Sequence, residues 1–258
     1  MHPKTQAVHR PPHSPATTEE IAVMPGYSLI VALHVLAGVV ALVGFWSAAF
    51  MKKGSPRHRL LGKVYLVAMA VIVVTALPIT IQFAFFRQQP LSALFLAYLM
   101  AITGNATWLA WRAVTDKRDW KQLVSRPGWH LALWPMVILA LVVVGTGIQH
   151  RQPLFLGFSS IGLWVGWRML KFARRGPSRP DWAFRQHYQS ILGAGIATHV
   201  AFLGIGMRPV WQWLHSHTTV PALLIELFPW AAPLLVAVLV GVYLDRKYGG
   251  RRVAKAAQ

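Results

Sequence analysis

The sequence contains no cysteine, and this absence excludes several kinds of structural and redox site. Without thiols the chain forms neither disulfides nor thiolate-bound zinc sites. It also holds neither an iron–sulfur cluster nor a haem attached covalently through a Cys-x-x-Cys-His motif. The inorganic cofactors that remain are a b-type haem and a metal ion bound by histidine, of which the chain has 11.

Charged side chains are scarce as well. They make up 13% of the 258 residues, whereas soluble domains contain about 25%. Hydrophobic residues account for 55%, and the mean hydropathy is +0.45. A chain with so little charge cannot cover a water-exposed surface, so lipid must be its solvent. The sequence therefore predicts an all-α polytopic membrane helix bundle, with the lipid bilayer as its main partner.

Acidic residues are the scarcest charged type, with seven Asp and Glu against 26 Lys and Arg. In a soluble protein the resulting net charge of +19 would suggest nucleic-acid binding. Here the basic residues cluster in short connectors between apolar runs, so we expect no nucleic-acid partner. No Asp or Glu lies near the middle of a run, which disfavours a carboxylate-coupled transporter and a cation channel with an acidic ring.

Seven apolar runs each approach the ~20 residues that cross a bilayer core of ~30 Å. They are Tyr27–Phe50, Val64–Phe86, Leu91–Ala113, Trp129–Ile148, Leu154–Phe172, Gln186–Met207 and Ala222–Leu244. We therefore expect seven transmembrane helices in a membrane domain over residues 26–246. The polar stretch 1–25 is predicted to be a disordered N-terminal tail, and residues 247–258 a basic cytoplasmic tail.

The basic residues fall mostly on one side of this arrangement. Twenty-one of the 26 lie at the C-terminus or in and beside the connectors after the first, third and fifth runs. Because Lys and Arg are enriched in cytoplasmic loops, the N-terminus is expected outside and the C-terminus in the cytoplasm.

Histidines are the ionisable groups that remain inside the predicted spans. His34 and His199 should lie ~10 Å and ~12 Å below the outer ends of their helices, at similar depth. His130 and His187 each open a helix at the inner face. Two histidine layers would suit two b-type haems, each bound by imidazoles from facing helices. We therefore take His34, His199, His187 and His130 as cofactor ligands for transmembrane electron transfer to a quinone or another redox partner.

Other functions fit the same residues. His187 and His199 are twelve residues apart, or ~120° around a helix, so each haem would need a different partner helix. The histidines could instead only hydrogen-bond between helices, or line a small polar cavity with Asn105 in a non-redox small-molecule carrier. A structural or assembly partner in a membrane complex is a third alternative. No pattern in the sequence indicates a catalytic residue.

The most distinctive motif lies in the first basic connector and its flanks. It comprises His34, Gly38, Lys53-Gly54, His58-Arg59, Gly62 and Tyr65, and a late run adds His187, Ile191, Gly193, Ile196-Ala197-Thr198 and Ala201-Phe202-Leu203. These residues resemble a family of uncharacterised predicted bacterial integral membrane proteins with a His-Arg-x-x-Gly-x-x-Tyr first-loop signature. The resemblance implies a compact multi-pass bundle in the bacterial cytoplasmic (inner) membrane, and it implies no particular activity.

Three residues of this motif are further inner-face candidates. We expect His58 and Arg59 to lie beside the inner cofactor or its propionates, with Tyr65 close by on the next helix.

Overall fold

The computed structural model describes the backbone of residues 23–256 and the side chains as far as Tyr248. The predicted tail 1–25 lies almost wholly outside the described residues. The helices are α1 Tyr27–Phe50, α2 Pro56–Ile81, α3 Pro90–Thr115, α4 Trp120–Ser125, α5 Pro127–Gln149, α6 Pro153–Arg175, α7 Trp182–Ala201, α8 Arg208–His217 and α9 Ala222–Ala256. No strand occurs in this part of the chain, which confirms the all-α prediction.

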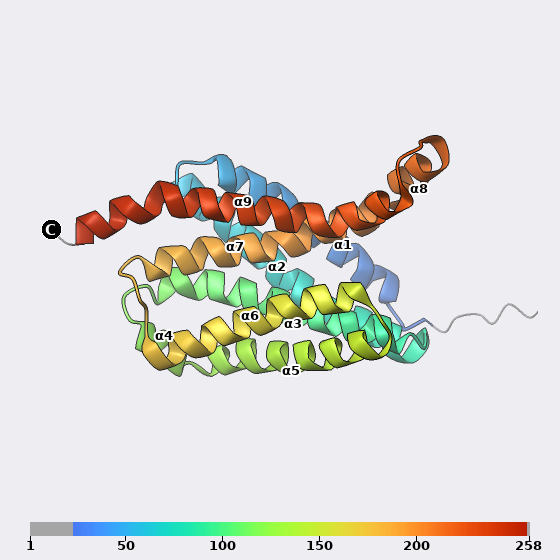
Figure 1. The fold of residues 1–258 in the computed structure, drawn as a ribbon, viewed down its shortest axis with the longest axis horizontal. Helices are drawn as coiled ribbons and strands as arrows, with labels where there is room; N and C mark the ends of the chain where they lie inside the picture. Colours follow the sequence, from blue (N-terminus) through green and yellow to red (C-terminus); the bar gives the residue numbers. More distant parts are fainter. Residues whose placement is uncertain (1–22, 257–258) are drawn as a thin grey trace, which may run out of the picture.

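The long helices lie side by side along the long axis of the molecule (Figure 1). Six of them are long and apolar enough to cross a membrane, namely α1, α2 with its continuation to Phe86, α3, α5, α7 with its continuation to Gly206, and α9. The described chain is thus a multi-pass membrane helix bundle. Helix α6 is 23 residues long but is not among the six, because its apolar stretch is interrupted by Arg168 and several small or polar residues and is slightly less hydrophobic than theirs.

The second helix begins earlier than the sequence predicted. We expected it to start at Val64, whereas α2 begins at Pro56. Ser55 is the N-cap, and its hydroxyl accepts a hydrogen bond from the His58 backbone N–H at 3.2 Å. Pro56 fits the first helical position, where its missing N–H costs nothing. His58 and Arg59 therefore lie on the first turn of α2 and not in a loop.

Two helices end in a π-helical turn at the same end of the bundle. Turn η1 (Gln82–Phe86) follows α2, and turn η2 (Phe202–Gly206) follows α7. In α2 the turn comes four residues after Pro78, which has no N–H to give the helix. Turn η2 leads into the short helix α8, where the Trp211 indole N–H donates to the Leu203 carbonyl at 2.5 Å.

Helix α3 lies at the centre of the bundle, and it packs against α2, α5 and α7. Around it, α1 packs on α2, α6 on α5, and α9 on α7. A tyrosine of α3 makes two hydrogen bonds to the backbone of α6. The Tyr98 hydroxyl donates to the Phe158 carbonyl at 2.6 Å and accepts from the Gly162 N–H at 3.1 Å.

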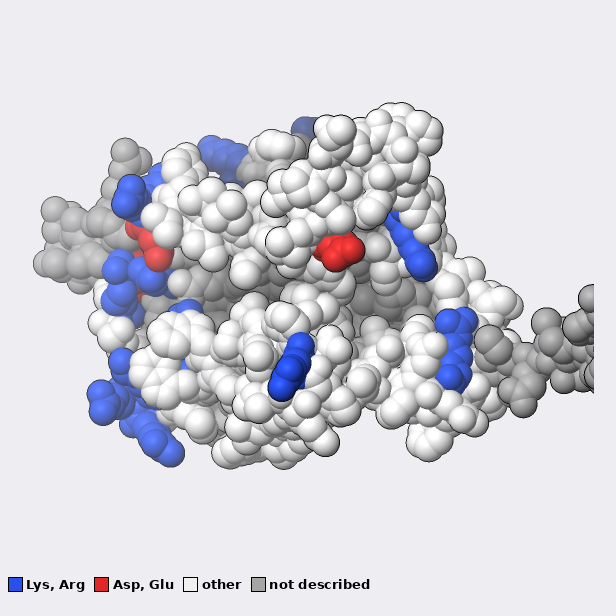
Figure 2. All heavy atoms as spheres, turned by 45° about the vertical axis from the view of Figure 1, so that its right-hand side comes forward, with Lys and Arg blue, Asp and Glu red and all other residues white. Residues whose placement is uncertain are grey.

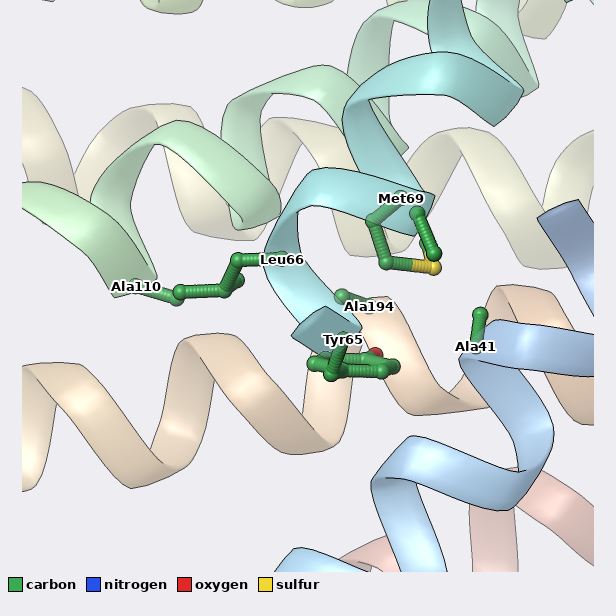
Figure 3. Packing of buried hydrophobic residues seen from close by; sticks show 7 residues of the cluster. Ala41, Tyr65, Leu66, Met69, Ala110 and Ala194 are labelled. Atoms are coloured by element: carbon green, nitrogen blue, oxygen red, sulfur yellow. The ribbon is translucent and has the colours of Figure 1, made fainter. Parts of the chain in front are cut away.

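Small residues bring four helices together around Tyr65 and Met69, as Figure 3 shows. Ala41 of α1, Ala110 of α3 and Ala194 of α7 are fully buried against this pair. Close approach through small residues is the usual packing of membrane helices, because lipid supplies no hydrophobic force between them. The predicted inner-face residue Tyr65 is therefore part of the packed interior.

Replacing Gly162 by alanine should destabilise the bundle. A Cβ at this position would lie 2.5 Å from the Tyr98 hydroxyl oxygen, so the α3–α6 contact would have to open. Overpacking of this kind costs about 1–3 kcal/mol. The free energy of unfolding in mixed detergent and sodium dodecyl sulfate micelles measures the loss. Gly157→Ala, on the same helix but with open space around the new Cβ, is the control. Equal stability of the two variants would contradict the assigned packing.

Candidate functional site

A cleft of about 1360 Å³ runs along the bundle. Its walls come mostly from α1, α2, α3, α6 and α7, with Trp129 of α5 and Trp230 of α9. At one end it is lined by Tyr27 and Arg87, and at the other by Arg175 and Ser178. Figure 2 shows the surface hollowed between two ridges of helices, with Lys and Arg gathered at one end of the molecule.

The cleft exists because α6 and α7 are consecutive helices that do not pack along their lengths. Helix α6 lies on α5, whereas α7 lies on α3 and α9. The connector between them turns at Gly176, where φ is +71° and a Cβ would lie 2.8 Å from the Trp120 ring. The space between the two helices is therefore open along the side of the bundle.

The middle of the cleft is apolar, with a small number of polar groups. Asn105 is buried, and its amide donates to the Ala132 carbonyl at 2.9 Å and to the Met169 sulfur at 3.1 Å. His34 Nδ1 lies 2.8 Å from the Thr75 hydroxyl, which itself donates to the Val71 carbonyl. Because the Thr75 hydroxyl gives its proton to a carbonyl, His34 Nδ1 is the donor in this pair.

The cleft carries positive charge only. Four basic residues line it, and no Asp or Glu is among its described lining residues. They are Arg87, Arg168, Lys171 and Arg175. Sequence reasoning did not select Arg168, although an arginine inside an apolar run is itself a signal of function. The Arg168 guanidinium donates to the Gln189 side-chain carbonyl at 2.8 Å, across the opening between α6 and α7.

The aspartates of the basic end serve to fasten the connectors. Asp116 is buried and is paired with Arg112 and, at 2.9 Å, with Arg126. Asp181 is paired with Arg179 at 2.9 Å, and this hydrogen bond raises the pKa of the Arg179 guanidinium.

Helices α7 and α9 are joined in the same way at this end. Asp245 of α9 is paired with Arg185 of α7 at 2.9 Å and also accepts from the Tyr188 hydroxyl. These three carboxylates thus form ion pairs with other arginines, and none of the described ion pairs includes a cation that lines the cleft.

The predicted outer pair of histidines does not form. His199 accepts from the Trp46 indole N–H at 2.9 Å through Nε2 and donates to the Gly195 carbonyl at 2.7 Å through Nδ1. Trp46 is twelve residues, or ~18 Å, further along α1 than His34. The prediction that His34 and His199 share one depth is therefore wrong. It assumed helices whose outer ends are level, whereas α7 meets α1 near the C-terminal end of α1.

The predicted inner ligands His187 and His130 do not lie next to each other, and His187 lies near His58 instead. His187 Nδ1 donates to the Ala110 carbonyl at 2.9 Å, and His58 Nδ1 donates to the Ala48 carbonyl at 3.0 Å. The two imidazoles are close enough to interact electrostatically. His130 is exposed on α5, which packs against α3 and α6 and not against α7. Arg59 is exposed as well, one residue beyond His58.

The histidines predicted from the sequence therefore do not surround one common cavity. His34 lines the cleft, whereas His58, His187, His199 and His130 do not. Among the residues with described side chains, no group of three or more His, Cys, Asp or Glu could hold a metal ion.

Comparison with protein-family models, with curated proteins and with solved structures gives no match to this chain. The resemblance of the first-connector motif therefore stays a prediction, and the function has to be argued from the geometry of the cleft.

Proposed function

We propose that the protein binds a membrane-soluble small molecule within the bilayer, as a non-redox carrier. The observation that supports this proposal is the cleft. Its volume of about 1360 Å³ exceeds the range of typical ligand pockets, which is about 300–1,000 Å³. Apolar walls with a few convergent polar groups are the usual composition of such sites. His34 and Asn105, which the sequence suggested for a polar cavity, both line it.

The opening between α6 and α7 gives the cleft access from the side. A ligand dissolved in the membrane could enter there without crossing the aqueous loops. The apolar part of the ligand would pack against the apolar walls of the cleft. The Nε2 atom of His34 could accept a hydrogen bond from a ligand hydroxyl or amide.

Filling the cleft should weaken ligand binding. Gly38 lines the cleft, and a Cβ added there meets nothing within 4 Å, so Gly38→Leu places a side chain in the open space. We expect about tenfold weaker retention of phosphatidylglycerol and phosphatidylcholine of matched chains, because the filled cleft no longer buries an acyl chain. The detergent-purified chain is delipidated and then incubated with each lipid, and native mass spectrometry counts the lipids that it retains.

Gly145→Leu is the matched control, because Gly145 also has open space around it but lies on the exposed surface of α5. It should retain both lipids as the native chain does. Failure of the native chain to retain either lipid would overturn the proposed function.

We further propose that α6 is a seventh span, that the N-terminus lies outside and that the C-terminus lies in the cytoplasm. Helix α6 returns along α5 for its whole length, as Figure 1 shows. The basic residues that lower its hydropathy lie toward its C-terminal end, where long cationic side chains can reach the headgroups. With seven spans the connectors 51–55, 116–126 and 176–181, together with the Lys and Arg of the adjoining helix ends, all face the cytoplasm, in keeping with the positive-inside rule.

This topology can be tested cleanly because the native chain has no cysteine. Lys117→Cys lies in the connector after α3, and Thr219→Cys lies between α8 and α9. In intact cells a membrane-impermeant maleimide should label Cys at 219 and leave Cys at 117 unlabelled until the membrane is opened. Labelling of both positions, or the reverse pattern, would contradict the proposed orientation.

A second candidate function is haem binding between His58 and His187 for electron transfer. Metal-ligating histidines generally donate their other ring N–H to a carbonyl or carboxylate. His58 and His187 both donate Nδ1–H to a backbone carbonyl in this way, which leaves Nε2 of each as the ligand atom. A bound b-type haem would supply one-electron redox chemistry. Neither histidine lines the cleft, so this candidate comes second.

An optical spectrum separates the two candidates. If haem binds, dithionite reduction of protein expressed with haem supply should give a sharp α-band at one haem per chain. His58→Ala and His187→Ala should each remove it, while the exposed His130→Ala should keep it. A colourless, monodisperse native protein would overturn the haem candidate and leave the carrier proposal intact.

A further inference from the structure

Arg168 lines the cleft and forms no direct ion pair in the described part of the chain, although Asp245, which is paired with Arg185, acts on it electrostatically. Arg168 lies seven residues before Arg175, the last residue of α6, which places it ~10 Å from the helix end. Its side chain makes a hydrogen bond to the uncharged amide of Gln189. The ion pairs of the described chain involve Arg112, Arg126, Arg179 and Arg185, and none of them includes Arg168.

A guanidinium at this depth is costly unless an anion compensates its charge. Arginine has five N–H donors in a planar fork, and the hydrogen bond to Gln189 uses one of them. The remaining donors match a phosphate, which arginine can bind through two parallel hydrogen bonds. Because its printed hydrogen bond goes to a neutral amide and Asp245 is already bound to Arg185, the Arg168 guanidinium suits a direct contact with an anionic ligand.

Two more cations extend this site along α6. Lys171 and Arg175 follow Arg168 at intervals of three and four residues, so the three share one face of the helix. All three line the cleft, and the Lys171 ammonium lies 5.1 Å from the centre of the Trp167 ring. With no described acidic residue in the lining, this row also disfavours a ligand headgroup that carries its own positive charge.

We propose that the ligand of the cleft is an anionic phospholipid whose phosphate binds Arg168 and the row formed with Lys171 and Arg175. An acyl chain then lies along the apolar stretch toward His34, and the lipid enters through the opening between α6 and α7. This inference rests on the proposed function, because it assigns the headgroup chemistry of the molecule that the cleft binds.

Matched lipids and variants test the headgroup assignment. The detergent-purified full chain is titrated with phosphatidylglycerol or phosphatidylcholine of identical acyl chains, and bound lipid is counted by native mass spectrometry. The native chain should favour phosphatidylglycerol. Arg168→Gln should weaken phosphatidylglycerol binding about tenfold or more, since a charge-assisted hydrogen bond is lost, and should change phosphatidylcholine binding much less. Soluble glycerol 1-phosphate should not compete, because it has no acyl chain to occupy the cleft.

Arg174→Gln is the control for a general loss of positive charge, since Arg174 lies on the same helix but outside the cleft lining. It should bind phosphatidylglycerol as the native chain does. Equal binding of both lipids, unchanged in Arg168→Gln, would overturn the anionic-headgroup inference while leaving a lipid-binding cleft. An equal loss in Arg174→Gln would overturn it too, and retention of neither lipid would overturn the proposed function itself.

Discussion

The arrangement of the bundle depends on the hydrogen bonds that tie α3 to its neighbours. Tyr98 bonds to a backbone carbonyl of α6, Asn105 bonds to one of α5, and His187 of α7 bonds to a carbonyl of α3. Between helices in lipid, polar contacts and close packing of small residues replace the hydrophobic effect as the source of association. Helix α3 makes both kinds of contact, so the α5–α6 pair and the α7–α9 pair are each placed relative to it.

The cleft follows from this central position of α3. Because α6 and α7 are held by different partners, neither has to pack on the other, and the space between them stays open. The charged side chains also fall into two groups. Carboxylates at the basic end pair with arginines of the connectors and helix ends, while the hydrogen-bond partner of Arg168 in the opening is the Gln189 amide. The fold therefore separates the ion pairs that stabilise it from the cations that face the cleft.

The sequence predicts the helical architecture well, because a long apolar run is a local property of the chain. It placed the start of α2 eight residues late, since the basic residues around His58 resemble a loop although Ser55-Pro56 is a cap signal. It could not predict the surroundings of the histidines or the cleft. The depth of His199 depends on how α7 crosses α1, and the cleft depends on which helices pair. Neither property has a period or a motif in the sequence.

Helix α6 shows how the composition of a helix follows from its contacts. One part of its surface is built for close contact, with Gly162 against Tyr98 of α3 and Gly166 against Val137 of α5. Glycines there lower the hydropathy without exposing polar atoms. Another face carries cations into the cleft, where an anionic ligand would offset the cost of holding charge at membrane depth. The residues that make α6 the least apolar of the long helices are thus those that pack it on α3 and α5 and the cations that line the cleft.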